Sequence, residues 1–288
     1  MSNQKSLGQF IAEGRIPLNK SYACNILAEG DSWFNLGFLP TPGKTRNLLD
    51  PLKFKKDTVI VNLATLGDTL EHMERITKNP HLFTALDLRK WDLIFLSGGG
   101  NDLIDALLGN YFVNGQKLEV LNKLSAPGSD FKDYINMQGV KDFMGVIENC
   151  YIELAKLRST MTDGKNKNTE IITHCYDYIQ PRDAPANMLI SFGPWVYIAM
   201  TEIYKIPEQF WLDIANYMFA ELQQMMMMGL ETRIDKFHVL KTQGTLTPAK
   251  PHTTGNSNDW KNEIHPNAGG YKKLAETHIQ PLIDQILT

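Results

Sequence analysis

The hydrophobic pattern of this chain alternates between short apolar runs and longer stretches with helical spacing. Five short runs, each of four to six residues and bounded by turn residues, predict buried β-strands. They span residues 25–28, 58–63, 93–97, 170–174 and 237–240. Because such runs are separated by helical stretches, they indicate a parallel sheet covered on both faces.

Three of the intervening stretches carry apolar residues at the spacing of an amphipathic helix. One apolar stripe covers residues 143–157, a second covers 211–225, and a third covers 271–286 near the end of the chain. Proline is favoured in the first turn of a helix and glycine just after its end. We therefore expect the second helix to begin at Pro207 and to end at Gly229.

The length of the chain bounds its domain organisation. Strands that alternate with helices define the α/β class, and 288 residues fit one domain, 1–288, with insertions. Two stretches, near 104–135 and 181–206, do not fit the alternation. Both follow predicted strands, at the edge where open α/β sheets bind ligands, so they are candidates for a lid or a substrate wall.

Charge and apolar runs limit the partners. A net charge of −3 gives no general attraction to nucleic acid or anionic lipid, so we expect no nucleic-acid partner. Residues 1–20 contain no long apolar run, so neither a secretory signal nor a membrane span is predicted there.

Three cysteines, Cys24, Cys150 and Cys175, cannot all pair within the chain and lack metal-ligand spacing. We interpret them as buried thiols in a reducing compartment. A cytoplasmic location is the expectation, although export without a leader would leave no trace in the sequence.

Candidate chemistry is placed around Ser32, which directly follows the first predicted strand. A serine nucleophile needs a base for its proton and N–H donors for the oxyanion that its attack creates. Two other blocks could supply them: Gly99-Gly100-Asn101-Asp102 after the third strand, and Ile264-His265-Pro266 before the last helix. Because parallel strands end at one edge of a sheet, we expect these blocks to meet there.

These blocks resemble those of the SGNH (GDSL-type) hydrolases. Gly30-Asp31-Ser32, the glycine of Leu66-Gly67-Asp68, and the two later blocks occur in the family's order, from residue 25 to the end of the chain. The resemblance implies a flavodoxin-like three-layer α/β/α fold with a five-stranded parallel sheet in the order 2-1-3-4-5. It also implies ester or acyl hydrolysis without a metal.

The same resemblance assigns roles to individual residues. Ser32 would be the nucleophile and His265 the general base. The oxyanion hole would consist of the backbone amides of Ser32 and Gly67 and the side-chain amide of Asn101. Taken alone, the serine block could be a helix cap and the Asn101 block a tight turn. Asp31 and Asp102 are assigned structural roles, as hydrogen-bond partners of nearby turns.

One position departs from the family pattern. An aspartate is expected three residues before the histidine, and Asn262 stands there. An amide oxygen can hold the tautomer of an imidazole but cannot stabilise imidazolium as a carboxylate does. Asn262 ranks first as the orienting residue and Asp259 second; a backbone carbonyl is a third option. Glu263 lies only two residues before His265, and we expect it to point away.

Other rim residues have two interpretations. Tyr178 or Arg182 could contact a substrate, but we favour a structural interpretation in which His174 is an interior histidine and Asp177 forms a turn. Aromatic residues that flank the rim could line an acyl pocket or belong to the core: Trp33, Phe34, Phe38, Phe192 and Trp195. The other histidines show no zinc-binding arrangement, so neither a metal nor a cofactor is expected.

The sequence therefore favours a metal-independent serine ester hydrolase of the carboxylesterase or lipase kind, acting on a small-molecule or lipid ester through an acyl-enzyme. Acyl transfer to another hydroxyl and deacetylation of a carbohydrate would use the same residues. From another class, a binding protein that keeps the fold and has lost turnover is suggested by Asn262.

Overall fold

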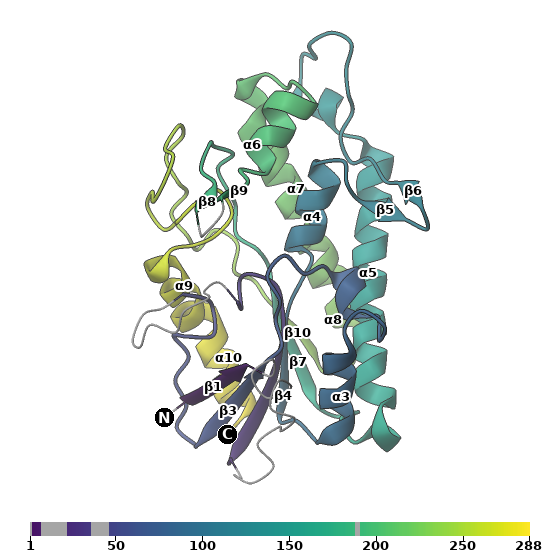
Figure 1. Cartoon of the computed structure of the whole chain (residues 1–288), viewed down its shortest axis with the longest axis vertical. Helices are drawn as coiled ribbons and strands as arrows, with labels where there is room; N and C mark the ends of the chain where they lie inside the picture. Colours follow the sequence, from purple (N-terminus) through teal and green to yellow (C-terminus); the bar gives the residue numbers. More distant parts are fainter. Residues whose placement is uncertain (1, 7–21, 36–45, 188–190) are drawn as a thin grey trace.

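A six-stranded parallel sheet forms the centre of the molecule (Figure 1). The computed structural model describes residues 2–6, 22–35, 46–187 and 191–288. The sheet has the order β1-β3-β2-β4-β7-β10. Its strands are β1 (Ser2–Ser6), β2 (Cys24–Gly30), β3 (Thr58–Asn62), β4 (Leu93–Ser97), β7 (Glu170–His174) and β10 (Phe237–Leu240). Two short hairpins lie apart from it: β5 (Phe112–Val113) with β6 (Gln116–Lys117), and β8 (Ala186–Asn187) with β9 (Ser191–Phe192).

The five strands predicted from the apolar runs are confirmed, and they occur in the predicted order 2-1-3-4-5. The sixth strand, β1, pairs with β3 at the edge of the sheet. Its sequence, SNQKS, contains no apolar residue, so the hydrophobic pattern could not indicate it.

Helices cover both faces of the sheet (Figure 1). On one side lie α3 and α5, and on the other lie α9 and α10, which are joined by a π-helical turn. The α-helices are α2 (Leu70–Met73), α3 (Pro80–Leu88), α4 (Gly100–Leu107), α5 (Met137–Thr160), α6 (Val196–Ile198), α7 (Trp211–Met225), α8 (Glu231–Arg233), α9 (Ala268–Leu274) and α10 (Gln280–Ile286). None of the helices in the described ranges is long and apolar enough to cross a bilayer.

The predicted end of the second helix is wrong. The helical path continues past α7 through a π-helical turn, Met226–Leu230, and ends with α8 at Arg233. Gly229 is not a C-terminal cap, because the helical path continues through it to α8. The Glu148 carboxylate of α5 lies beside it, where a Cβ atom would push that carboxylate aside. Local sequence rules do not distinguish such a glycine from a helix stop.

The core is continuous across the strands. Every residue of β3 and of β4 is buried, as expected for parallel strands with helices on both faces. Cys24, Cys150 and Cys175 are free and buried, which confirms their interpretation as interior thiols.

The backbones of β2 and β4 approach each other closely immediately before Ser32. Gly30 pairs with Ser97 across the sheet, and a Cβ atom at position 30 would lie 2.7 Å from both the Cβ and the carbonyl oxygen of Ser97. Only glycine fits between the two strands at this point, and the turn that carries Ser32 starts from it.

Gly30→Ala tests this close approach. We expect the free energy of unfolding, measured by urea denaturation, to fall by about 1–3 kcal/mol, because the added methyl group overpacks a rigid contact. The control is Gly145→Ala on α5, where a Cβ meets no atom within 4 Å. That substitution should raise the free energy of unfolding by about 0.4–1 kcal/mol. Equal stability of the two variants would contradict the packing described for Gly30.

Candidate active site

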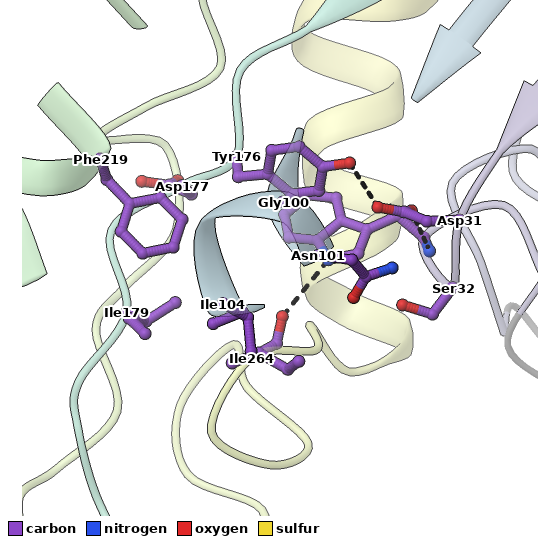
Figure 2. Close-up of a pocket in the computed structure, with 11 residues that line it drawn as sticks. Asp31, Ser32, Gly100, Asn101, Ile104, Tyr176, Asp177, Ile179, Phe219 and Ile264 are labelled. Atoms are coloured by element: carbon purple, nitrogen blue, oxygen red, sulfur yellow. Dashed lines mark hydrogen bonds between the residues drawn. The ribbon is translucent and has the colours of Figure 1, made fainter. Parts of the chain in front are cut away.

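The turn after β2 is built by Asp31. Its backbone carbonyl accepts hydrogen bonds from the N–H groups of Phe34 and Asn35, both at 3.1 Å, and its carboxylate accepts one from Trp33 N–H at 2.9 Å. These bonds fold the chain sharply at the carboxyl end of the strand. Ser32 is consequently held at the tip of the turn, where it lines a pocket (Figure 2).

A polar network underlies the same turn. The second carboxylate oxygen of Asp31 accepts a hydrogen bond from Tyr176 (Figure 2). Ser97 donates to the first carboxylate oxygen at 3.1 Å. Burial raises the pKa of Asp31 to about 6, while these hydrogen bonds oppose the rise. The carboxylate of Asp102, also buried, accepts from Leu70 N–H at 3.0 Å. Both aspartates therefore contact nearby turns, as predicted.

Ser32 and His265 are in hydrogen-bond contact, although 233 positions separate them in the chain. The distance from Ser32 Oγ to His265 Nε2 is 2.8 Å, and His265 Nδ1 lies 3.1 Å from Asn262 Oδ1. The same amide oxygen accepts the backbone N–H groups of Ile264 and His265, at 3.1 and 2.9 Å. An atom that faces two N–H donors must be the acceptor oxygen, so Nδ1 carries the ring proton and the Nε2 lone pair faces the serine hydroxyl.

Burial sets the protonation of this imidazole. His265 is 3% exposed, and its burial, aided by the positive charge of Lys261, lowers its pKa from 6.5 to about 3. Among the described residues no carboxylate contacts the ring to offset this cost; its partner on the Nδ1 side is the neutral amide of Asn262. The imidazole is therefore a neutral proton acceptor near pH 7, but its protonated form is poorly stabilised.

The alternative carboxylates are engaged elsewhere. Asp259 accepts a hydrogen bond from Thr247 N–H at 2.7 Å and pairs with Lys273 at 3.3 Å, so it makes no hydrogen bond to His265. Glu263 points away from the histidine, as expected. Its carboxylate accepts four backbone N–H groups, from Arg182, Trp195, Val196 and Tyr197, at 2.6–3.3 Å.

Arg182 holds the other side of the histidine loop. Its side chain is buried, and the guanidinium donates to the backbone carbonyls of Asn262 at 2.7 Å, Thr253 at 2.8 Å and Gly255 at 2.6 Å. It is thus a structural residue rather than a substrate contact. We define Arg182 and Glu263 as the loop clamp. The sequence did not indicate this role, because contacts between residues 66–81 positions apart leave no local pattern.

The neighbouring residues also have structural contacts. His174 lies in the interior with Nε2 2.9 Å from Ser97 Oγ. The Asp177 carboxylate accepts four backbone N–H groups, one from Tyr178 and three from residues 244–246. The predicted interpretation of His174 and Asp177 is confirmed.

Of the predicted oxyanion donors, Ser32 and Asn101 line the pocket and Gly67 does not. One N–H of the Asn101 amide donates to the backbone carbonyl of Asp68 at 2.9 Å, which leaves its other N–H for a ligand. Asn101 and Ser32 line the same pocket (Figure 2). Gly67 has a φ of 78°, which favours glycine, but it is exposed and does not line this pocket. The catalytic roles of all these residues stay predictions.

The aromatic residues are divided between the core and the rim. Trp33 and Phe34 are buried, and Trp33 also lines the pocket. The Trp195 ring packs edge-on against His265, with ring centres 6.0 Å apart, whereas Phe192 is 46% exposed. Phe38 lies outside the described residues.

The pocket takes a single wall residue, Ile104, from the first predicted insertion and none from the second among its described lining residues. The second insertion instead supplies the backbone that binds Glu263. In the described ranges, no group of three or more His, Cys, Asp or Glu side chains is placed to hold a metal ion.

Comparison with known proteins supports the fold. No protein-family model matches the sequence, and no curated protein matches it significantly. Among solved structures, an extracellular lipase from Streptomyces rimosus aligns with a TM-score of 0.50 and 11% identity, over 91% of this chain and 99% of that one. A member of the lipolytic G-D-S-L family from Veillonella parvula gives 0.43 and 14%, over 88% and 94%. An aryl esterase from M. smegmatis gives 0.44 and 14%, over 91% and 99%.

At such identities the likeness concerns the fold alone. The structural neighbours of this chain are lipases and esterases of the SGNH (GDSL) type, over about 90% of its length. The resemblance inferred from the four sequence blocks, with its flavodoxin-like α/β fold, is thereby confirmed at the level of the fold.

The role of Asn262 can be tested on the imidazole itself. Asn262→Asp should raise the pKa of His265 from about 3 towards its ordinary value of 6.5, because a carboxylate stabilises the imidazolium. The measurement is an NMR titration of the His265 ring. Asp259→Asn, which removes a carboxylate bound to Lys273, is the control and should leave the pKa of His265 unchanged. An unchanged pKa in Asn262→Asp would exclude residue 262 as the partner of the ring.

The loop clamp can be tested with two buried arginines. Arg158 also donates to backbone carbonyls, those of Thr169 and Asp235. These residues lie just before β7 and β10, at the edge of the sheet opposite the one that carries Ser32. Lysine cannot reproduce the planar fork of arginine, so Arg182→Lys and Arg158→Lys should each lower the free energy of unfolding by about 1–3 kcal/mol.

Only Arg182→Lys should also slow the reaction of Ser32 with a fluorophosphonate, by about 10- to 100-fold, because it displaces His265. The rate is measured by mass spectrometry on folded protein. Equal labelling rates in the two variants would show that Arg182 contributes to stability alone.

Proposed function

We propose that this protein is a metal-independent hydrolase of carboxylic esters that uses Ser32 as its nucleophile. The observation that carries the proposal is the 2.8 Å contact between the Ser32 hydroxyl and the unprotonated Nε2 of His265, on a fold shared with lipases and esterases. A hydroxyl paired with a neutral imidazole is the arrangement that nucleophilic acyl chemistry requires. Asn101 supports it by presenting an amide N–H in the same pocket.

The proposed reaction has two halves. Ser32 Oγ attacks the ester carbonyl carbon while its proton passes to His265 Nε2, and the developing oxyanion accepts hydrogen bonds from the Asn101 side chain and the Ser32 backbone N–H. The predicted third donor, Gly67 N–H, lies outside the pocket and would have to approach for this step. The leaving alcohol then takes the proton from His265, and an acyl-enzyme remains. Water, deprotonated by the same nitrogen, attacks the acyl carbon; the bond from that carbon to Ser32 Oγ breaks, Oγ takes the proton back from His265, and the carboxylic acid is released.

Asn262 shapes the expected rate. Its oxygen holds Nδ1–H and therefore keeps Nε2 free for the serine proton. It adds no negative charge, so the imidazolium that forms in each half-reaction receives less stabilisation than from an aspartate. Slow turnover follows from this geometry.

A second candidate is a binding protein that retains the site without turnover. The same neutral partner favours it, together with the burial of Ser32 and His265, which are 4% and 3% exposed. This candidate predicts neither ester hydrolysis nor covalent labelling of Ser32. Acyl transfer and carbohydrate deacetylation remain variants of the first candidate, distinguished by the acceptor and by the acyl donor.

The deciding experiment combines labelling with turnover. A fluorophosphonate should modify Ser32, located by peptide mass spectrometry, and the purified protein should hydrolyse p-nitrophenyl acetate. Ser32→Ala should abolish both. Asn101→Ala should lower kcat by about 100- to 1000-fold, which is the usual effect of losing one oxyanion donor.

The control is Asp259→Ala, whose carboxylate binds Thr247 and Lys273 and should leave kcat unchanged. An adduct on another serine, or full activity in Ser32→Ala, would overturn the proposal.

A further inference from the structure

We propose that the substrate carries a short acyl group, of two or three carbons, and that this group occupies the pocket beside Ser32. The inference deepens the proposed function and rests on it. The pocket is formed where α4, α7, the segment after β7 and the histidine loop converge.

The arrangement of the reacting groups assigns this pocket to the acyl side of the ester. Ser32 and Asn101 line the pocket, whereas His265 does not. During the reaction the leaving oxygen must receive its proton from His265, so the alcohol lies on the histidine side of the serine. The acyl chain extends from the same carbonyl carbon in another direction, next to Asn101, and the pocket is located there.

The wall of the pocket is apolar and rigid. Figure 2 shows Ile179 and Phe219 at the end of the pocket away from the Ser32 hydroxyl. Ile104 and Ile264 lie between that end and Ser32. All four side chains are at most 9% exposed. Buried side chains at native packing density cannot move aside without disturbing their neighbours. The size of the pocket is therefore set by buried side chains on α4, α7 and the two loops that close it.

The carboxylate side chains of the wall are already partnered. The carboxylate of Asp177 binds four backbone N–H groups, and that of Asp31 binds Tyr176, Ser97 and Trp33 N–H. The pocket also contains no cationic side chain among its described lining residues. It therefore suits a neutral hydrocarbon group rather than a carboxylate or phosphate on the acyl chain.

The free volume limits the length of that chain. About 20 Å³ is open to the centres of water-sized groups, which is the room of roughly one such group. A methyl group has similar dimensions. An acetyl group thus fits, a propionyl group fits with small adjustments, and each further methylene has to displace buried side chains.

The first test measures kcat/KM of the wild-type protein for p-nitrophenyl acetate, butanoate and octanoate. We expect the acetate ester to exceed the butanoate by at least about tenfold and the octanoate by about 100-fold or more, since one methylene in a hydrophobic pocket changes kcat/KM by about 10- to 200-fold.

A second test enlarges the pocket. Phe219→Leu should raise the ratio of butanoate to acetate turnover by about tenfold. The matched control is Phe143→Leu, a buried phenylalanine on α5 that does not line the pocket. It removes the same atoms from the core and should leave the ratio unchanged. The ratio compares two substrates of one sample, so partial loss of folded protein does not affect it.

The outcomes separate the two proposals. Hydrolysis of octanoate at or above the rate for acetate, with Ser32 labelled by a fluorophosphonate, would overturn the acyl-pocket inference and leave the proposed function standing. An equal shift of the ratio in Phe219→Leu and Phe143→Leu would likewise overturn the acyl-pocket inference alone. Absence of both labelling and hydrolysis would overturn both proposals.

Discussion

The hydrogen bond between Ser32 and His265 depends on a loop whose backbone is held from both sides by buried charged groups. Glu263 binds the N–H groups of the segment that begins α6, and Arg182 binds three carbonyls, one of them that of Asn262. A buried charge without partners is strongly destabilising, so neither side chain can release its backbone partners cheaply. The position of the imidazole is thereby linked to the packing of distant segments.

Within that loop, the amide oxygen of Asn262 both shapes the backbone turn and orients the histidine ring. Asn262 Oδ1 accepts two backbone N–H groups, which shape the turn, and faces the ring Nδ1, which sets the tautomer. Among the described residues, the ring at this site is therefore oriented without a negative charge beside it. The amide provides the orientation that a carboxylate would provide but adds no negative charge beside the ring, whose pKa burial lowers.

The sheet brings the remaining groups together. Because all its strands are parallel, the turn after β2, the start of α4 and the loop before α9 meet beyond one edge. On the side of the strands lie polar contacts, from Asp31 to Ser97 and Tyr176, that fix the nucleophile turn. On the other side, α4 and α7 contribute the apolar wall of the pocket. Ser32 therefore lies between the polar contacts that fix its turn and the apolar wall of the pocket.

Patterns local in the chain were sufficient for five of the six strands, because apolar runs depend on neighbours in sequence; the order of those strands and the roles of the rim residues were implied by the resemblance to the SGNH hydrolases. Local patterns could not indicate β1, which has no apolar residue, or the continuation of the helix through Gly229. They also left the partner of His265 open among Asn262, Asp259 and a backbone carbonyl. Only the tertiary structure decided that Asn262 faces the ring and that Arg182 and Glu263 hold its loop. The physical reason is that a buried polar group is satisfied by whichever atoms the completed fold brings within about 3 Å, and those atoms lie far apart in sequence.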